Sequence, residues 1–214
     1  VRELRAFGEA EVEGGFLRAL QLCAVLEQQL GSVAAGAYLR DGHQPSKSSA
    51  AMSTARPAAL AAALACAAKR AARENLRLLV WDAYRPQRAV NRFLAWCAAP
   101  EDGRTKQRHY PNIDKSQIVP LGYVAARSGH SRGSAIDLTL TREDGSLLDM
   151  GGCFDLMDEM SHHGAPVAEP AARNRLLLKE IMEESGFQPY ANEWWHYSLA
   201  EEPYPDTYFD FPLA

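Results

Sequence analysis

The sequence predicts an α+β fold, in which one domain has a central, mainly antiparallel sheet flanked by helices. Helical and strand-like segments are intermixed without the regular βαβ rhythm that accompanies a parallel sheet. Asp144-Gly145 follows one strand-like segment directly, as expected for the turn of an antiparallel hairpin. The 214 residues are enough for one good core and too few for two. We therefore expect a single domain over residues 1–214.

The N-terminal part of the chain predicts two helices separated by a loop. Residues 12–30 show an apolar helical face that stops at Gly31. Residues 41–56 contain an Asp-Gly pair and a serine cluster, which indicate a polar loop. The alanine-rich stretch 57–73 predicts a helix with Pro57 in its first turn. So many alanines indicate close packing against a sheet or another helix.

The middle of the chain predicts a buried strand, a helix and a long connection. Residues 76–81 form an apolar run that leads toward Pro86, which ends the strand. Residues 87–98 carry apolar side chains at helical spacing. Residues 99–127 are rich in charge and proline and predict mostly loop, a length that in a compact domain often serves function.

Residues 134–140 alternate in the manner of a half-buried strand. Ile136, Leu138 and Leu140 point to one face, and Asp137 points to the other. Asp137 is therefore expected on the side of the sheet away from the aliphatic core.

The C-terminal part of the chain predicts a helix, a strand and a tail. Residues 170–185 have helical spacing, and Gly186 provides a stop signal. Residues 193–199 predict the last strand. Residues 201–214 are rich in proline and aromatic side chains and are expected to lie over the surface as a packed flap.

Composition excludes several classes of function. The net charge is −4 and the isoelectric point about 5.9, so nucleic acid is not an expected partner. No apolar run approaches the roughly 20 residues of a membrane span, and the start of the chain has no signal peptide. A cytoplasmic and a periplasmic location both remain open. The four cysteines form no CxxC pair, so we expect free thiols rather than a disulfide framework.

Two short segments together offer the ligands of a catalytic zinc ion. His130 lies in a glycine-flanked turn, Asp137 follows on the adjoining strand, and His196 comes from the distant last strand. Two imidazoles and one carboxylate leave one position of a tetrahedral Zn²⁺ open for water, which distinguishes a catalytic zinc site from a structural one. Each residue taken alone has an ordinary interpretation, as a hydrogen-bonded histidine or an arginine-paired aspartate. Their combination favours the metal site.

Glu193 and Arg85 are candidates for the chemistry beside that metal. Glu193 can accept a proton from water and deliver it to a leaving amine; the alternative is a solvated glutamate at a strand end. In a regular strand Glu193 and His196 would face opposite sides, so they share the site only through a turn or a bulge. Arg85 follows a buried strand, where it can stabilise an oxyanion or bridge a structural carboxylate such as Asp82. The sequence leaves both roles open.

The other histidines have weaker claims to function. His43 and His109 lie in polar segments and are expected to be solvated. Adjacent side chains in a regular element point apart, so His162 and His163 are expected to be structural or to shape a pocket rim.

Several motifs together give the chain a resemblance to a known family. They are Asp82-Ala-Tyr-Arg85-Pro86, Ser128-x-His130-x-x-Gly133-x-Ala135-x-Asp137, Asp149-Met-Gly-Gly-Cys-Phe-Asp155, Ser161-His162-His163, the helix from Asn174 to Gly186-Phe187, and Glu193-Trp-Trp-His196. Over roughly residues 74–200 the chain resembles the zinc D-alanyl-D-alanine dipeptidases, a group within the peptidase family that also holds D,D- and L,D-carboxypeptidases of peptidoglycan. The Trp-Trp pair and the Asp-Met-Gly stretch point to the dipeptidase branch.

The resemblance implies a D,D-peptidase-like (hedgehog-like) zinc fold and roles for individual residues. It implies zinc on His130, Asp137 and His196, Glu193 as base and Arg85 at the transition state. It also implies that Ser128 and Asp155 contact the substrate. A free dipeptide carries an ammonium group, for which a buried Asp155 is a suitable partner. A helix N-cap or a surface acid is the alternative for Asp155.

The expected function is zinc-dependent hydrolysis of D-Ala-D-Ala to two D-alanines, with a small D-dipeptide as the binding partner. The resemblance implies a role in peptidoglycan metabolism or recycling, and vancomycin resistance is compatible with it. One alternative is a D,D- or L,D-carboxypeptidase acting on peptidoglycan stem peptides. Another is a binding module without catalysis, against which an intact Glu193 and Arg85 argue. Residues 1–60 match the family poorly, and Tyr38 is the one tyrosine there that could reach a substrate.

Overall fold

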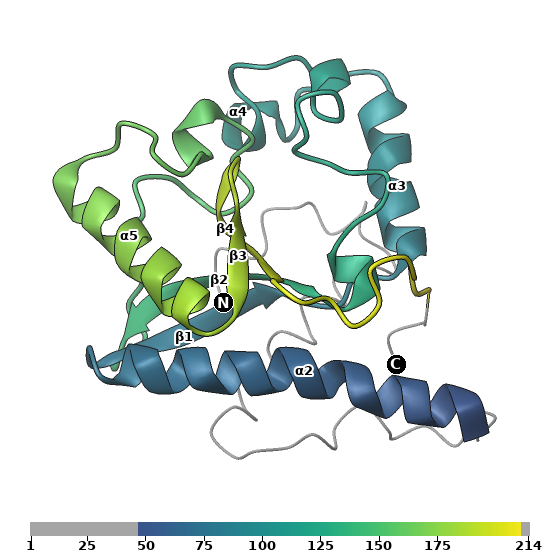
Figure 1. Cartoon of the computed structure of the whole chain (residues 1–214). Coiled ribbons are helices and arrows are strands. Elements are labelled where there is room, and N and C mark those ends of the chain that lie inside the picture. Colours follow the sequence, from purple (N-terminus) through teal and green to yellow (C-terminus); the bar gives the residue numbers. More distant parts are fainter. Residues whose placement is uncertain (1–46, 211–214) are drawn as a thin grey trace.

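The computed structural model describes residues 47–210, which form a four-stranded sheet with helices packed on it (Figure 1). The elements follow in the order α2 (Lys47–Ala72), β1 (Leu76–Asp82), α3 (Gln87–Ala98), α4 (Lys106–His109), η2 (Lys115–Gln117), η3 (His130–Arg132), β2 (Ala135–Arg142), η4 (Glu159–Ser161), α5 (Glu169–Glu184), β3 (Phe187–Tyr190) and β4 (Glu193–Leu199), where η marks a short 3₁₀ helix. The strand order is β1-β2-β4-β3, and each neighbouring pair is antiparallel. The predicted α+β class with an antiparallel sheet is confirmed. The predicted helix 12–30 lies outside the described residues.

Helix α2 begins earlier than the sequence predicts. It starts at Lys47, well before Pro57, so the expected loop was wrong over residues 47–56. This stretch contains alanine, methionine and lysine, which favour helix, and the serines that suggested a loop are only mildly unfavourable. The remainder of the predicted loop lies outside the described residues.

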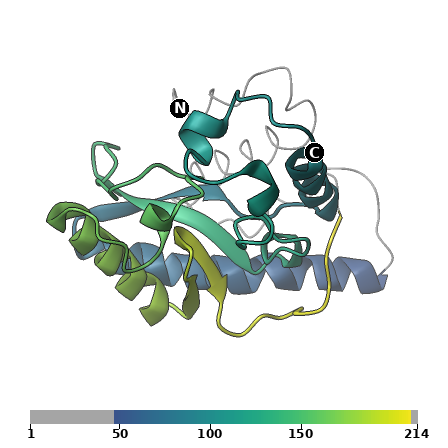
Figure 2. The same ribbon diagram turned by 90° about the horizontal axis from the view of Figure 1, so that it is seen from above.

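The core lies between the sheet and the helices α2 and α5, which contact each other as well as the strands (Figures 1 and 2). Small side chains of α2 make this close approach possible, because Ala67 and Ala71 are completely buried at helical spacing. The sheet contributes Ile136, Leu138 and Leu140, all fully buried in the same cluster. The predicted packing of the alanine-rich helix and the predicted face of β2 are both confirmed.

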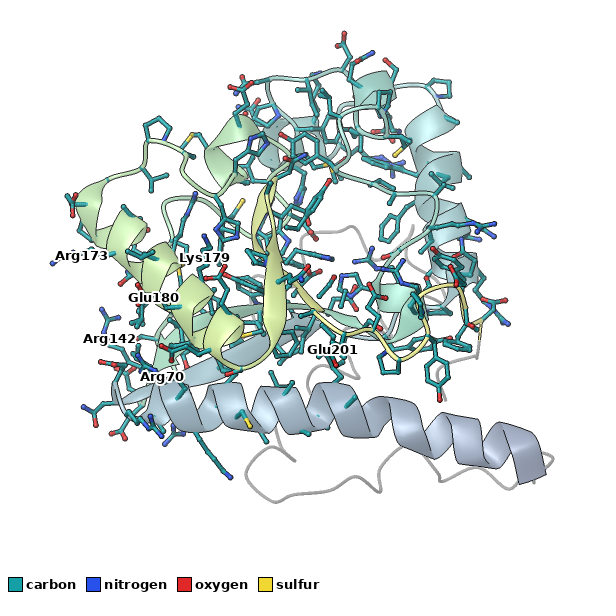
Figure 3. The ribbon with its side chains drawn as sticks, in the orientation of Figure 1. Arg70, Arg142, Arg173, Lys179, Glu180 and Glu201 are labelled. Atoms are coloured by element: carbon teal, nitrogen blue, oxygen red, sulfur yellow. The ribbon has the colours of Figure 1, made fainter. Side chains whose placement is uncertain are left out.

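Charged side chains cover the outer surfaces of these two helices. Arg70 near the end of α2 forms an ion pair with Glu184 at the end of α5, with Nε and Oε2 2.7 Å apart. Arg173 and Lys179 of α5 form ion pairs with Glu169 and Glu183, one turn away on the same helix, and Arg173 lies at the outer edge of the molecule (Figure 3). Exposed pairs of this kind contribute little to stability, so the apolar interface holds these helices in place.

The hairpin turn after β2 is confirmed. The amide of Arg142 donates to the carbonyl of Ser146 at 2.9 Å, and Gly145 adopts the positive φ of 82° that the turn requires. Residues 87–98 and 193–199 also form their elements with the predicted bounds. Helix α5 (Glu169–Glu184) begins and ends one residue earlier than the helix predicted over residues 170–185.

The tail packs onto the domain, as expected for residues 201–210. Phe209 is buried, and its amide donates to the carbonyl of Ser131 in η3. Its carbonyl accepts from the amide of Gln87 at the start of α3. The tail thereby connects α3 with the turn that carries His130.

The cysteines of the described part are free thiols, as predicted, and they are Cys66, Cys97 and Cys153. Of these three, Cys97 is buried, and Cys66 and Cys153 are exposed. Among residues 47–210, the helices are all too short or too polar to span a membrane.

Candidate metal and active site

The site is built on the face of the sheet opposite the aliphatic core, where side chains of neighbouring strands align. Asp137 of β2 is the direct partner of His196 of β4, and their Oδ1 and Nδ1 atoms are 2.9 Å apart. On the other side of Asp137 lies Asp82, its partner in β1. A register shift between Val80 and Asp82 makes this possible. In a regular strand Asp82 would point to the same face as Val80, into the core.

His130 joins this row from η3, the turn that precedes β2. Gly133 ends the turn with a φ of 67°, a conformation that favours glycine. The Nε2 atom of His130 lies 3.2 Å from Nδ1 of His196 and 3.3 Å from Oδ2 of Asp137. Its Nδ1 atom lies 2.7 Å from the carbonyl oxygen of Ala83. Because a carbonyl only accepts, Nδ1 carries a hydrogen, and Nε2 is the ring atom that faces the cluster as a possible metal ligand.

The donor atoms of His130, Asp137 and His196 fit a single metal ion. They all lie within 4.8 Å of one another. Donors about 2.0–2.2 Å from one tetrahedral Zn²⁺ are roughly 3.3–3.5 Å apart, close to the 2.9–3.3 Å contacts described above. Two imidazole nitrogens that face each other beside a carboxylate need a proton or a cation between them. The donor chemistry and the spacing both match two imidazoles and one carboxylate around a metal.

The electrostatics of Asp137 and His196 are consistent with ligand chemistry, whereas His130 beside the Asp137 carboxylate favours a proton that a metal ion would have to displace. Burial alone would raise the pKa of Asp137, but His130 and His196 hold it well below its usual range. Burial lowers the pKa of His196, and Asp137 opposes this only in part. For His130, burial lowers the pKa, but Asp137 more than compensates. An ionised carboxylate and a neutral imidazole are the forms that bind metals.

Glu193 lies beside the donor cluster because strand β4 is irregular. The pairing of β3 with β4 shifts register between Pro189 and Tyr190, so Glu193 and His196 come to the same side. Oε2 of Glu193 lies 3.7 Å from Nδ1 of His196. Burial, together with the nearby carboxylates of Asp137 and Asp155, raises the pKa of Glu193 well above its ordinary value. The bulge that the sequence required for a shared site is present.

Arg85 also reaches the row, through Asp82. Its Nε and Nη2 atoms lie 2.8 and 2.7 Å from Oδ2 of Asp82, and Nη2 lies 3.7 Å from Oδ2 of Asp137. Burial would lower the pKa of Arg85, but these two carboxylates raise it above its ordinary value. Arg85 therefore pairs with Asp82, and this pairing orients a permanent cation next to the donor cluster. The two interpretations of Arg85 are compatible.

Asp155 approaches the cluster from a loop rather than from the sheet. Its backbone adopts a left-handed conformation with φ 57°, and its side chain is partly buried. Burial first, and then the carboxylate of Asp137, raise the pKa of Asp155 to about 7. The N-cap alternative was wrong, because Asp158 caps η4 by accepting from the amide of Met160. Asp155 is thus an acid on the site side of the loop, close enough to sense Asp137 and Arg85.

The pattern of one peptidase family matches this chain. It is the peptidase M15 family, described as D-ala-D-ala dipeptidase, and it matches residues 47–214. The chain belongs to this family. The resemblance found in the sequence is confirmed, and the matched region includes each of the candidate site residues.

Individual relatives agree with the family match. A D-alanyl-D-alanine dipeptidase of Streptomyces coelicolor is 59% identical over 158 residues, which are 73% of this chain and 78% of the relative. One from Enterococcus faecium is 57% identical over 145 residues, which are 67% of this chain and 72% of the relative. A more distant one from Escherichia coli is 44% identical over 128 residues, covering 59% and 57% of the two chains.

Ser128, a predicted substrate contact of this family member, has a structural contact as well. Its Oγ atom accepts from the amide of His130 at 3.2 Å, and its side chain is buried. The hydroxyl therefore helps to fix the turn that carries His130.

The structure shows the surroundings of two other histidines, His109 and His162. His109 was expected to be solvated, but it is buried, with Nδ1 3.0 Å from the carbonyl oxygen of Asp155. Its partner comes from a loop far along the chain, so no local pattern signals the contact. His162 shares a 2.9 Å hydrogen bond with the hydroxyl of Tyr123. Burial first, and then the charges of Asp158, Glu159 and Glu193, raise the pKa of Tyr123 to about 12. This agrees with a place for His162 at the rim of the site.

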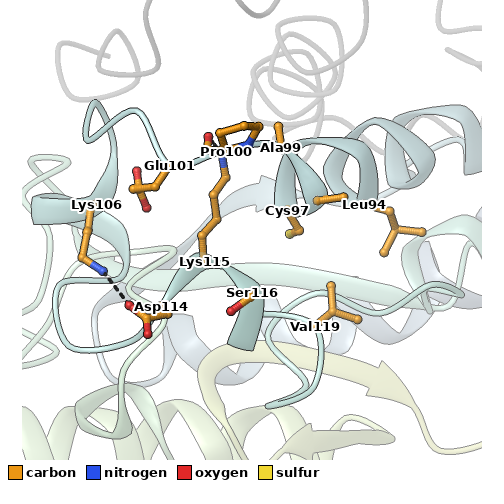
Figure 4. A pocket seen from close by; sticks show the side chains of 11 residues that line it. Leu94, Cys97, Ala99, Pro100, Glu101, Lys106, Asp114, Lys115, Ser116 and Val119 are labelled. Atoms are coloured by element: carbon orange, nitrogen blue, oxygen red, sulfur yellow. Dashed lines mark hydrogen bonds and ion pairs between the residues drawn. The ribbon is translucent and has the colours of Figure 1, made fainter.

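A separate hollow of about 640 Å³ lies beside α3 (Figure 4). It is lined by Leu94, Cys97, Ala98, Ala99, Pro100, Glu101, Lys106, Asp114, Lys115, Ser116 and Val119. None of the candidate metal or catalytic residues lines it, so it is distinct from the site on the sheet.

Proposed function

We propose that this protein is a zinc-dependent dipeptidase that hydrolyses D-Ala-D-Ala to two D-alanines. The observation that carries the proposal is the cluster of His130, Asp137 and His196, with the carboxylate of Glu193 3.7 Å from its edge. The names of the relatives supply the substrate, and the donor set supplies the choice of metal. The prediction of a single domain over residues 1–214 stays a prediction, because the family match and the described structure both begin at residue 47.

His130, Asp137 and His196 would hold the zinc ion. When bound, zinc supplies Lewis-acid polarisation of the peptide carbonyl and of water. The carbonyl oxygen of Ala83 accepts the hydrogen on Nδ1 of His130, and a contact of this kind fixes the ring orientation of a metal-binding histidine.

Glu193 would move the proton during the reaction. Its carboxylate takes a proton from the attacking water and passes it to the nitrogen of the leaving D-alanine. Burial and the neighbouring carboxylates raise the pKa of Glu193, which strengthens it as a proton acceptor, and a bound metal cation would favour the ionised form that accepts the proton. Arg85, oriented by Asp82, would stabilise the negative charge that develops on the carbonyl oxygen.

Ser128 and Asp155 would contact the substrate. Asp155 is a partly buried carboxylate beside other carboxylates, a position in which a cation such as the substrate ammonium is favourable. A peptide that lacks a free ammonium would lose this interaction. The proposed selectivity is therefore for a free dipeptide.

The test is D-alanine release by zinc-loaded protein from D-Ala-D-Ala and from its N-acetylated form. Cleavage of the free dipeptide alone is the expected result. Cleavage of the acetylated form at a similar rate would instead indicate a carboxypeptidase. Cleavage of neither, with zinc bound, would indicate a binding module. A chelator-treated sample is the control, and it should release no D-alanine.

A further inference from the structure

Asp155 lies in the loop of residues 150–160, and its backbone conformation is uncommon. Asp155 has a φ of 57°, and among the described residues it shares a positive φ only with Asn75 and several glycines. This left-handed conformation is uncommon for a residue with a side chain, and aspartate tolerates it better than most. The direction of the Asp155 carboxylate depends on what holds its backbone.

A segment from far earlier in the chain lies along this loop. We call residues 108–112 the strap. The Sγ atom of Cys153 lies 4.0 Å from the carbonyl oxygen of Arg108, at one end of the contact. At the other end, Asn112 donates from Nδ2 to Oδ2 of Asp158 at 2.7 Å.

His109 makes the central contacts between the strap and the loop. Its Nδ1 lies 3.0 Å from the carbonyl oxygen of Asp155, and its own carbonyl accepts from the amide of Met157 at 2.6 Å. His109 thereby holds the peptide groups on both sides of the residue that follows Asp155. Among the strap contacts described, its ring makes the one that reaches Asp155 itself.

The ring of His109 acts as a neutral donor. The side chain is buried, and burial lowers its pKa, although the hydrogen bond to Asp155 opposes this. A carbonyl oxygen only accepts, so the hydrogen of the neutral ring lies on Nδ1. The contact therefore persists at neutral pH without placing a charge beside the site.

The two ends of the loop are fixed independently by Arg175 of α5. Its Nε donates to the carbonyl of Met150 at 2.6 Å, and its Nη1 donates to that of Met160 at 2.8 Å. Because Arg175 secures the ends and the His109 carbonyl still accepts from Met157, loss of the His109 side-chain donor would free the peptide group that follows Asp155 rather than unfold the loop.

We propose that His109 is a positioning residue that sets selectivity for the free amino terminus of the substrate, by holding Asp155 where its carboxylate meets the substrate ammonium. The inference rests on the proposed dipeptidase function and adds to it a residue outside the metal site. It predicts an effect on ammonium recognition and no effect on the chemical step.

The experiment compares His109→Leu, which lacks the donor, with His109→Asn, whose Nδ2 replaces the histidine Nδ1 donor. The KM for D-Ala-D-Ala is measured beside the competitive Ki of N-propionyl-D-alanine, which has the same peptide and carboxylate but no ammonium. His109→Leu should raise the KM about 10- to 100-fold, since small displacements of a positioned group have effects of this size. It should leave kcat and the Ki of the analogue unchanged, and His109→Asn should restore the KM.

A matched control removes another hydrogen bond to the same region. Asn174 donates from Nδ2 to the carbonyl of Asp149 at 2.7 Å, and Asn174→Ala should leave KM and Ki as in the wild type. If His109→Leu does not fold, His109→Gln replaces it, because glutamine carries its donor farther from the backbone.

Different outcomes test the positioning role of His109 and the proposed dipeptidase function. Equal changes in the KM and in the Ki of the analogue, or an unchanged KM, would overturn the positioning role while leaving the proposed function intact. A wild-type protein that cleaves no dipeptide would overturn the proposed function, and the selectivity role with it.

Discussion

The two halves of the candidate site are held in place by different means. Asp137 and His196 lie on paired strands, where backbone hydrogen bonds set which side chains are neighbours. Asp155 lies on an irregular loop, where side chains of the strap and of α5 hold individual carbonyl groups. In the first half, the register of the ladder decides the geometry. In the second, each position depends on a contact from a distant part of the chain.

This difference separates the expected chemistry from the expected recognition. Asp137, His196 and Glu193 lie on the sheet half, with His130 in the turn before β2, whereas the proposed partner for the substrate ammonium lies on the loop half. Changes in the sheet should therefore affect turnover of any substrate, and changes in the loop should affect the choice of substrate. Three predictions examine this division.

The largest effect is expected at Glu193, on the sheet half. Glu193→Gln keeps the size of the side chain and removes the proton acceptor, so kcat should fall about 10²- to 10⁴-fold. Zinc content, measured by atomic absorption, should remain that of the wild type, because Glu193 is not among the proposed ligands. Exposed Glu201, on the tail, gives the matched control Glu201→Gln, which should leave kcat unchanged. Turnover retained by Glu193→Gln would contradict the proposed role.

A smaller and more selective effect is expected at Asp155, on the loop half. Asp155→Asn removes a charge-assisted hydrogen bond, an interaction worth about 1.5–3 kcal/mol. The KM for D-Ala-D-Ala should rise about 10- to 150-fold, with little change in kcat. Steady-state kinetics measure both values, and Asp206→Asn on the exposed tail is the control. A fall in kcat with an unchanged KM would place Asp155 in the chemistry and break the comparison.

The smallest effect is on stability, and it depends on pH. Burial and the Asp137 carboxylate raise the pKa of Asp155 to about 7 in the folded protein, against about 3.9 in an unfolded chain. Between these values the folded state keeps a proton that the unfolded state has lost. Asp155 therefore destabilises the metal-free fold increasingly as pH rises from about 4 to about 7.

The stability prediction is measured by thermal unfolding in the presence of a chelator. Asp155→Asn removes the acid, so its Tm advantage over the wild type should grow from about pH 4.5 to about pH 8. Each kcal/mol corresponds to about 2–4 °C for a domain of this size. An advantage that stays constant or shrinks across this range would show that Asp155 does not carry the shifted pKa.

The same division explains which features the sequence could predict. The strand 193–199 and the helix 87–98 were predicted with their observed bounds, because local periodicity and stop signals determine them. The cluster of His130, Asp137 and His196 followed from residue type and spacing. The start of α2 at Lys47 was not predicted, because the serine-rich composition of residues 41–56 is typical of a loop.

Features that depend on distant contacts were out of reach. The register shift that turns Asp82 to the site has no local signature, since the adjoining residues read as a continuous apolar strand. The burial of His109 arises from a loop more than forty positions later. Glu193 is an intermediate case. The sequence predicts that it shares the site with His196 only through a turn or a bulge, and the irregular pairing of β3 and β4 supplies the irregularity.

The alignment of Asp82, Asp137 and His196 in one row also limits how the length of this chain can vary during evolution. Deleting one residue between Ala135 and Asp137 would rotate the Asp137 side chain to the aliphatic face, because successive side chains in a strand alternate. The turn at Asp144 and Gly145 lies beyond that row and carries no such constraint. Insertions and deletions among relatives are therefore expected to collect at this turn, while the strand before it keeps a constant length.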